Sequence, residues 1–306
     1  MNVLITGSHG MIGSALAAAL PGAGETVVRA VRQAAGAPDE VRWDPVTGLI
    51  EDGPPIGAVV HLAGASIAGG RWTMERKREI ERSRVHLTHG LCEWLARRPT
   101  PPATLVAASA IGYYGDAGES PLDESSPPGN RWLAGVAERW ERASEPARQA
   151  GIRVVHLRFG LVLSRRGGAL APLRAIGRLG LLGPVGGGRQ FWSWIALVDV
   201  VAAIRLALKD AGLAGPVNVV APEPIRQRDF ARSLGRALHR PAIVPAPAIL
   251  VRALIGELAD DLLLASARVL PRRLLDRGFT WQHSDLDEAL RRLAGAGPFD
   301  GEGTRP

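Results

Sequence analysis

The feature that most constrains the fold is a group of three glycines near the start of the chain. An apolar segment, Val3–Ile5, leads directly into the stretch Thr6–Gly13. In that stretch Gly7 permits a tight turn, Gly10 lets an anion approach the backbone amides, and Gly13 lets a helix pack closely on a strand. The free amides and dipole of the following helix favour a bound phosphate group. We therefore predict a strand, a phosphate-binding turn and a helix. The other turn residues expected to contact the ligand are Ser8, Met11 and Ile12.

Short apolar runs alternate with longer helix-patterned segments over about the first 160 residues. Continuous apolar runs are typical of parallel strands that are buried on both faces, and the crossovers between such strands need helices. We therefore expect an α/β fold, a doubly wound parallel sheet of Rossmann type, with ligands at the carboxyl ends of the strands. The expected strands include Val3–Ile5, Thr26–Val28, Ala58–Leu62, Thr104–Ala107 and Val154–Leu157.

The pattern changes after Arg158. Glycine-rich loops at 167–168 and 183–188 are followed by a proline-punctuated stretch at 222–247, and helices are expected around 250–270 and 286–293. These features predict a smaller, mixed C-terminal lobe that holds the substrate. We assign residues 1–160 and about 191–216 to a dinucleotide-binding domain, and about 161–190 and 217–306 to the second lobe.

The end of the second strand indicates which dinucleotide binds. In a domain that selects NAD, an acidic side chain at this position accepts hydrogen bonds from the ribose 2′-hydroxyl. This chain has Arg29 and Arg32 there and no acid between residues 27 and 32. A guanidinium group pairs well with the 2′-phosphate of NADP, so the sequence favours NADP(H), with Arg32 as the better candidate. The alternative is a solvated arginine in an arginine-rich chain.

Further motifs follow the glycine turn along the chain. They are His61–Gly64, Ser83–Val85, Ser109–Gly115, Gly188–Gln190, Trp194–Ile195, Asn218 and Pro222. Over nearly the whole chain these motifs resemble the extended short-chain dehydrogenase/reductases, in particular the sugar-nucleotide epimerase-like branch. That branch is the NAD-dependent epimerase/dehydratase family with a C-terminal extension, which Pro271–Phe279 and the helices before it resemble.

The resemblance implies cofactor contacts beyond the glycine turn. They are Leu62, Ala63, Gly64, Glu79, Arg84 and Val162. His61 departs from the Asn that is usual before this second turn, and its ring can donate a comparable hydrogen bond.

The catalytic pair of the wider superfamily is missing. Its working members use a Tyr and a Lys four residues apart, and the Lys lowers the Tyr pKa so that the phenolate moves a proton. The only tyrosines here are Tyr113 and Tyr114, and the residues four positions further on are Ala117 and Gly118. We expect Ser109 to orient the substrate and Tyr114 to stand in for the missing phenol. The alternative for Tyr114 is a ring packed under the active-site loop.

Arg189, Trp192 and Arg158 are candidates for substrate binding. Trp192 and Trp194 flank Ser193 shortly after Arg189, and an aromatic wall beside a cation suits a nucleotide or a sugar phosphate. Arg158, at the end of the fifth strand, is a second candidate anion anchor. The alternative is that the tryptophans close the seam between the two lobes.

The sequence argues against a disordered, fibrous or membrane-spanning protein. Apolar residues make up 46% and charged residues 22% of the chain, as in ordinary globular proteins. No run reaches the roughly 18 apolar residues of a membrane span, and the N-terminus lacks a secretory pattern. The single cysteine, Cys92, fits a reducing compartment. We expect a cytoplasmic protein without a membrane partner.

Nucleic acid and metal are not expected ligands. The net charge is +7, but the basic residues are mostly arginines scattered among acids rather than a lysine-rich tract. His86, His89 and Cys92 recur every three residues, a step that drifts about 60° around a helix, and no fourth ligand is at hand.

Two classes of function follow from these observations. The first is an NADP-dependent oxidoreductase or epimerase that acts on a nucleotide sugar or a similar phosphorylated small molecule. The alternative is an NADP-binding module without turnover, whose occupancy reports redox state or stabilises an interaction surface. The cell-division label carried by relatives of the branch points weakly to the second class.

Overall fold

The computed structural model describes residues 1–33, 35–45, 50–51, 53–165 and 167–294. Within this part of the chain, the centre is a seven-stranded sheet with the order β12-β7-β5-β4-β1-β2-β3. Every neighbouring pair is parallel. The strand order reverses beside β1, the position where ligands bind in doubly wound sheets. The predicted Rossmann-type fold is therefore confirmed. The strands are β1 (Asn2–Thr6), β2 (Thr26–Val31), β3 (Glu40–Arg42), β4 (Ala58–His61), β5 (Thr104–Ala110), β7 (Arg153–Phe159) and β12 (Gly215–Val219).

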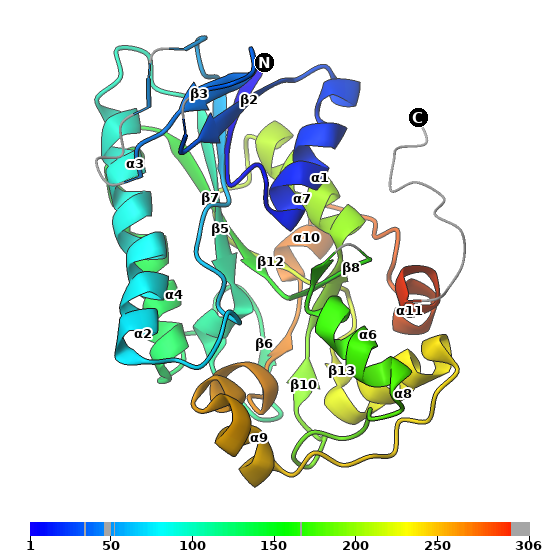
Figure 1. Ribbon diagram of the computed structural model, residues 1–306. Helices are drawn as coiled ribbons and strands as arrows, with labels where there is room; N and C mark the ends of the chain where they lie inside the picture. Colours follow the sequence, from blue (N-terminus) through cyan, green and yellow to red (C-terminus); the bar gives the residue numbers. More distant parts are fainter. Residues whose placement is uncertain (34, 46–49, 52, 166, 295–306) are drawn as a thin grey trace.

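Helices cover both faces of this sheet, as Figure 1 shows. They do so because the central strands are apolar on both sides: Val3, Leu4 and Ile5 of β1 are all 0% exposed. One face carries α1 (Met11–Ala19) and α7 (Leu197–Lys209), and the other carries α2 (Met74–Glu81), η2 (Arg82–His86), α3 (Leu87–Ala96), α4 (Trp132–Arg142) and α5 (Glu145–Gln149). Of the helices in the described residues, none combines the length and apolar character that a bilayer span requires.

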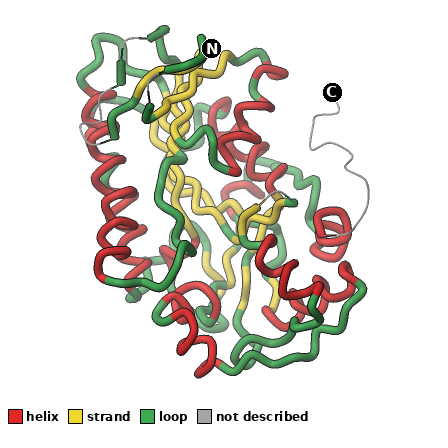
Figure 2. Tube along the Cα trace, in the orientation of Figure 1, coloured by secondary structure: helices red, strands yellow, loops and turns green. Residues whose placement is uncertain are grey.

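The smaller lobe mixes short strands with helices beyond the lower end of the sheet (Figures 1 and 2). Its core is apolar and includes Trp194 and Phe230, each 1% exposed. The elements of this lobe are β8 (Leu161–Ser164), β9 (Gly167–Gly168), α6 (Leu170–Arg178), β10 (Phe191–Trp192), β11 (Trp194–Ala196), β13 (Ile225–Arg226), α8 (Gln227–Leu238), α9 (Ala248–Ile255), η4 (Ala259–Leu263), β14 (Arg268–Val269), α10 (Arg272–Leu275) and α11 (Leu286–Ala294). The first domain also contains the short segments η1 (Pro21–Ala23), η3 (Ile111–Tyr114) and β6 (Pro121–Leu122).

The domain boundaries drawn from the sequence stay a prediction. In the structure, β10 and β11 pair with β13 and β8, whereas α7, which follows them directly, packs on the large sheet. The chain therefore crosses between the two lobes within residues 191–209.

Candidate functional site

The glycine turn joins β1 to α1 and lies against the turn that follows β4. Gly7 has a φ of +72°, and a Cβ built on it would lie 2.9 Å from the Ala63 amide nitrogen. A Cβ on Gly13 would lie 2.2 Å from the Gly7 carbonyl oxygen, so only glycine fits there. Gly10 is the N-cap of α1, and no side chain caps this helix. The amides of the first helical turn, which includes Met11 and Ile12, therefore remain free for a ligand.

Ser8 and the second turn complete this corner of the site. Ser8 is buried, with its hydroxyl 3.5 Å from His9 Nδ1. Leu62, Ala63 and Gly64 follow β4 directly, and the Ala63 amide donates to Thr6 Oγ1 at 3.4 Å. The two turns are thus held side by side at the carboxyl ends of adjacent strands.

His61 anchors the second turn from inside the protein. Its Nδ1 lies 2.7 Å from Thr6 Oγ1 and its Nε2 lies 3.0 Å from Thr88 Oγ1. The Thr88 hydroxyl also accepts a hydrogen bond from Trp140 Nε1 at 3.0 Å. Burial lowers the pKa of His61 to about 4, so the ring is neutral at physiological pH. The departure from the usual Asn therefore preserves a hydrogen-bonded anchor at this position.

Arg84 brings a buried positive charge to the same turn. It lies in the π-helical turn η2, a distortion often found at functional sites, and is 7% exposed. A Cβ built on Gly64 would lie 3.7 Å from Arg84 Cζ, and the ring of Trp140 is 5.1 Å from that atom. Among the described residues, Arg84 Nε has no hydrogen-bond partner and no carboxylate pairs with the side chain. Burial lowers the Arg84 pKa to about 10, so the group remains a cation that can receive an anionic ligand.

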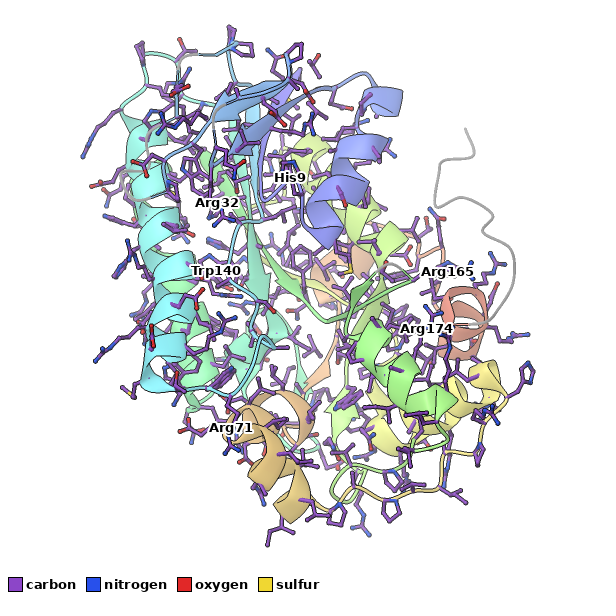
Figure 3. The ribbon with its side chains drawn as sticks, in the orientation of Figure 1. His9, Arg32, Arg71, Trp140, Arg165 and Arg174 are labelled. Carbon is purple, nitrogen blue, oxygen red and sulfur yellow. The ribbon has the colours of Figure 1, made fainter. Side chains whose placement is uncertain are left out.

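The arginines after β2 have different environments. Arg29 Nε and Nη2 donate to the Asp39 carboxylate at 2.7 and 2.8 Å, which neutralises the Arg29 charge. Arg32 follows β2 directly and is exposed, and among the described residues no ion pair is found for it. Figure 3 shows Arg32 and His9 at the same end of the sheet. Arg32 thus remains the candidate for a 2′-phosphate.

Val162 and Glu79 lie on opposite sides of this region. A Cβ built on Gly168 would lie 3.0 Å from Met11 Sδ and 3.2 Å from the Val162 carbonyl oxygen, so Val162 is near the start of α1. Glu79 is on α2, with a side chain that is 56% exposed and paired with Arg76 at 2.5 Å. The roles of both residues stay predictions.

Side chains from three adjacent strands meet in one buried network. Ser109, Arg158 and Asn218 are in register at the ends of β5, β7 and β12. Arg158 Nε and Nη2 donate to the Glu141 carboxylate of α4, each at 2.8 Å, and the Ser109 hydroxyl donates to the same carboxylate at 2.7 Å. Arg158 Nη1 donates to the Tyr114 hydroxyl at 2.9 Å, and Tyr114 donates to Asn218 Oδ1 at 2.7 Å. We call these five residues the Arg158 network.

The Arg158 network accounts for the ionisation of its members. Burial alone would raise the pKa of Glu141, but the hydrogen bonds and charge of Arg158 outweigh burial and leave that pKa below its ordinary value. Burial raises the pKa of Tyr114 to about 12, so this phenol stays protonated. Glu141 neutralises Arg158, which gives no support to Arg158 as a substrate anchor. The Ser109 and Tyr114 hydroxyls both bond within the network, and their catalytic roles stay predictions.

Sequence reasoning missed Glu141. The available signal was its place on the buried face of α4, which also carries Leu133 and Trp140. A carboxylate on an otherwise apolar helix face needs a cationic partner. The same helix presents Leu133 to η3, since a Cβ built on Gly112 would lie 3.0 Å from Leu133 Cδ2. An apolar side chain thus borders the end of β5.

Trp192 and Arg189 differ in exposure, because Trp192 is buried and Arg189 is on the surface. Trp192 is 8% exposed, packs 5.3 Å from the ring of Phe230 and donates from Nε1 to the Leu263 carbonyl at 3.3 Å. Trp194 is 1% exposed in the same core. Arg189 is exposed. Both tryptophans therefore pack in the core of the smaller lobe, the substrate-binding role of Trp192 stays a prediction, and Arg189 remains a surface candidate for substrate phosphate.

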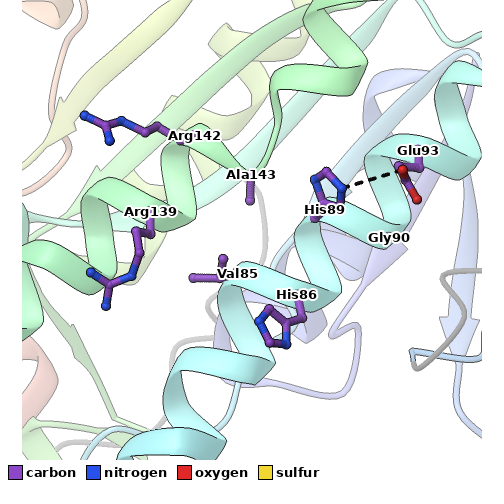
Figure 4. Close-up of a pocket in the computed structure, with 8 residues that line it drawn as sticks. All are labelled: Val85, His86, His89, Gly90, Glu93, Arg139, Arg142 and Ala143. Atoms are coloured by element: carbon purple, nitrogen blue, oxygen red, sulfur yellow. Dashed lines mark ion pairs between the residues drawn. The ribbon is translucent and has the colours of Figure 1, made fainter.

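A surface pocket of about 490 Å³ lies elsewhere, between α3 and α4 (Figure 4). Its lining includes His86, His89 and Arg139, and His89 Nε2 lies 3.6 Å from Glu93. Cys92, on the same helix, is buried. Across the part of the chain that the structure describes, no three His, Cys, Asp or Glu side chains are grouped to hold a metal ion.

Comparisons with known proteins give the family and the relatives that the chain is similar to. Residues 3–221 match the model of the NAD dependent epimerase/dehydratase family, and residues 246–293 match a domain of unknown function, DUF1731. Epimerase family protein Mb2239 of Mycobacterium bovis is 41% identical over 290 residues, which are 94% of this chain and 96% of the relative.

Two solved structures are similar in both sequence and fold. The crystal structure of human epimerase family protein SDR39U1 (isoform2) with NADPH matches with a TM-score of 0.89 and 33% identity, covering 96% of this chain and 99% of that one. The nucleoside-diphosphate sugar epimerase from Corynebacterium glutamicum matches with a TM-score of 0.80 and 34% identity, covering 96% of this chain and 58% of that one.

Proposed function

Because the chain belongs to the NAD dependent epimerase/dehydratase family, we propose that it binds NADP(H) where the two turns after β1 and β4 meet. The observation that carries the proposal is Arg84, a buried cation without a counter-ion among the described residues, set against Gly64. The free amides at the start of α1 add a second anion-binding element beside it. The NADPH in the structure of the human relative supports the same choice of cofactor.

Each part of the cofactor has candidate partners. The glycine turn would hold the pyrophosphate at the helix N-terminus, and Arg32 would pair with the 2′-phosphate. The rest of the cofactor would be surrounded by Leu62, Ala63, Gly64, Arg84, Val162 and Glu79. When bound, the nicotinamide supplies hydride transfer to or from a substrate carbon.

The proposed reaction is an oxidoreductase or epimerase step on a nucleotide sugar or a similar phosphorylated small molecule. The name of the Corynebacterium glutamicum relative, a nucleoside-diphosphate sugar epimerase, supports this substrate class. Arg189 is the exposed cation that would contact the substrate phosphates. A cytoplasmic location fits the single, buried cysteine Cys92.

A second candidate function is an NADP-binding module without turnover. Leu133 borders the end of β5, and the hydroxyls of Ser109 and Tyr114 are enclosed in the Arg158 network. The tyrosine-lysine pair of working relatives is missing from the sequence as well. These observations favour a protein that binds the cofactor without turning over a substrate.

A binding titration followed by a turnover assay separates these functions. Calorimetry with NADPH and NADH tests binding, and Arg32→Glu should weaken NADPH much more than NADH because the 2′-phosphate loses its cation. The protein is then mixed with NADP⁺ and UDP-glucose or UDP-N-acetylglucosamine, and nicotinamide reduction and sugar products are followed. Turnover supports the enzyme, whereas bound cofactor that stays inert to both sugars supports the module.

A further inference from the structure

We propose that Tyr113, rather than Tyr114, supplies the hydroxyl that transfers the proton, with Arg158 as the cation beside it; this inference rests on the proposed enzymatic function. Tyr113 lies in η3, directly after β5, at the carboxyl ends of the strands, where ligands bind in this fold. The wider superfamily joins a phenol to a lysine cation for this task. Here a phenol on η3 and a guanidinium on β7 meet.

The two tyrosines of the chain have opposite environments. Tyr114 is 2% exposed, and its hydroxyl accepts from Arg158 and donates to Asn218. Tyr113 is partly exposed, and among the described residues its hydroxyl makes no hydrogen bond. Only Tyr113 therefore offers a phenol that is free to exchange a proton with a bound molecule.

Arg158 is fixed against the ring of Tyr113. Its Cζ lies 3.5 Å from the centre of that ring and 5.1 Å from the centre of the Tyr114 ring. The two hydrogen bonds to Glu141 hold the guanidinium in place. Glu141 balances the net charge of the pair, but the guanidinium is the member that faces the Tyr113 ring. Its oriented N–H dipoles stabilise negative charge developing on that phenol without further reorganisation.

The backbone around Tyr113 is also held. Its carbonyl oxygen accepts a hydrogen bond from the Gly129 amide at 2.9 Å. The ring of Tyr114 packs edge-on against the Tyr113 ring, with the ring centres 5.3 Å apart. Tyr113 is therefore positioned by its neighbours while its hydroxyl stays unbonded, as a proton-transferring group requires.

The proposed step conserves atoms and charge. A substrate alcohol gives its hydroxyl proton to the Tyr113 phenolate oxygen, while the hydrogen on the same carbon leaves with its electron pair as a hydride to the oxidised nicotinamide. The carbon–oxygen double bond forms, and Tyr113 becomes a neutral phenol. In the reverse direction Tyr113 returns the proton to the oxygen as the hydride comes back to carbon.

The matched variants Tyr113→Phe and Tyr114→Phe test this assignment. Tyr113→Phe loses a hydroxyl without a protein partner, so we expect an unchanged thermal midpoint and NADPH affinity but turnover of UDP-glucose or UDP-N-acetylglucosamine reduced at least about 100-fold. Tyr114→Phe breaks two buried hydrogen bonds. It should lower the thermal midpoint and reduce turnover by less than Tyr113→Phe does.

Nitration with tetranitromethane gives a readout that needs no sugar substrate. Because Tyr113 and Tyr114 are adjacent and share one tryptic peptide, tandem mass spectrometry locates the nitro group from fragment ions that break the chain between them. Tyr113 should be nitrated first, and saturating NADP⁺ should slow that nitration by covering the site. Nitration of Tyr113 at the same rate with and without NADP⁺ contradicts the inference.

The outcomes distinguish this inference from the function on which it rests. Equal turnover by Tyr113→Phe and the wild-type protein overturns the role of Tyr113 and leaves the proposed function intact. A wild-type protein that binds NADPH but converts neither sugar overturns the enzymatic function, and the role of Tyr113 fails with it.

Discussion

At the scale of single residues, Arg84 is the side chain whose environment best reveals a missing partner. A buried charge without a counter-ion costs several kcal/mol, and a bound anion offsets that cost. Replacing it by Met should therefore leave the thermal midpoint of the ligand-free protein unchanged or higher, while NADPH affinity falls more than about tenfold. Thermal unfolding and calorimetry measure the two effects. Arg78→Met, an exposed change on the same helical segment, is the control. A lower midpoint with normal NADPH binding would make Arg84 a structural residue.

Glu141 and Arg158 form the second test at this scale. Glu141→Gln leaves Arg158 buried without its counter-charge and should lower the free energy of unfolding by about 3–5 kcal/mol. Glu138→Gln is a matched control on the same helix, because its partner Arg142 is 74% exposed. That exposed pair should contribute less than about 1 kcal/mol. Urea denaturation compares the two variants, and equal losses would contradict a central role for the Arg158 network.

Single site residues were more predictable from the sequence than their grouping. Arg158 stood out at the end of an expected strand, and the family resemblance indicated Ser109 and Tyr114. That Ser109 and Arg158 face each other depends on the register between β5 and β7, which periodicity does not reveal. Glu141 is distant in the chain from Ser109, and only helix packing brings the two together.

At the scale of elements, helix propensity and packing have opposite preferences at Gly13, where the glycine turn enters α1. Alanine is the better helix former by about 1 kcal/mol, but a Cβ at Gly13 would overlap the Gly7 carbonyl oxygen. The overlap dominates, so Gly13→Ala should lower stability by about 1–3 kcal/mol and abolish NADPH binding. Gly22→Ala is the control, because a Cβ there meets nothing within 4 Å. Thermal unfolding and calorimetry decide, and a stable Gly13→Ala protein that binds NADPH would refute the close packing.

The long apolar elements were predictable, and the short ones were not. The strands β1, β4, β5 and β7 each contain a buried run of four or more residues, which gives a clear sequence signal. The edge strand β3 has three residues with one buried side chain, too few to show a period. The π-helical turn η2 that holds Arg84 depends on local backbone geometry inside a longer helical segment.

At the scale of the whole molecule, contacts distant in sequence tie the C-terminal lobe to the first domain. Asp261 accepts a hydrogen bond from the Leu133 amide at the start of α4, and Lys77 pairs with Glu257. Arg71 donates to the carbonyl oxygen of Ala253 at the end of α9. The sequence predicted a second lobe but not these contacts, since nothing local specifies partners about 130–180 residues apart.

Two buried histidines make the stability of the whole molecule depend on pH. Burial lowers the pKa of both His61 and His156 from 6.5 to about 4. Between these values the unfolded chain takes up protons that the folded protein does not, so stability falls as the pH falls, by up to about 3 kcal/mol for each histidine. Urea midpoints at about pH 7 and about pH 5 measure the loss. His61→Asn should reduce this dependence, whereas exposed His89→Asn should not. If the urea midpoint falls equally between these two pH values in the wild-type protein, His61→Asn and His89→Asn, the buried His61 is not a source of the pH dependence.

The claim that the glycine turn and its neighbouring guanidinium groups hold a phosphorylated nicotinamide dinucleotide is tested most directly by calorimetric titration of the purified wild-type protein. The account predicts saturable binding of NADPH at one site per chain, with weaker binding of NADH. A flat titration with both coenzymes would contradict it.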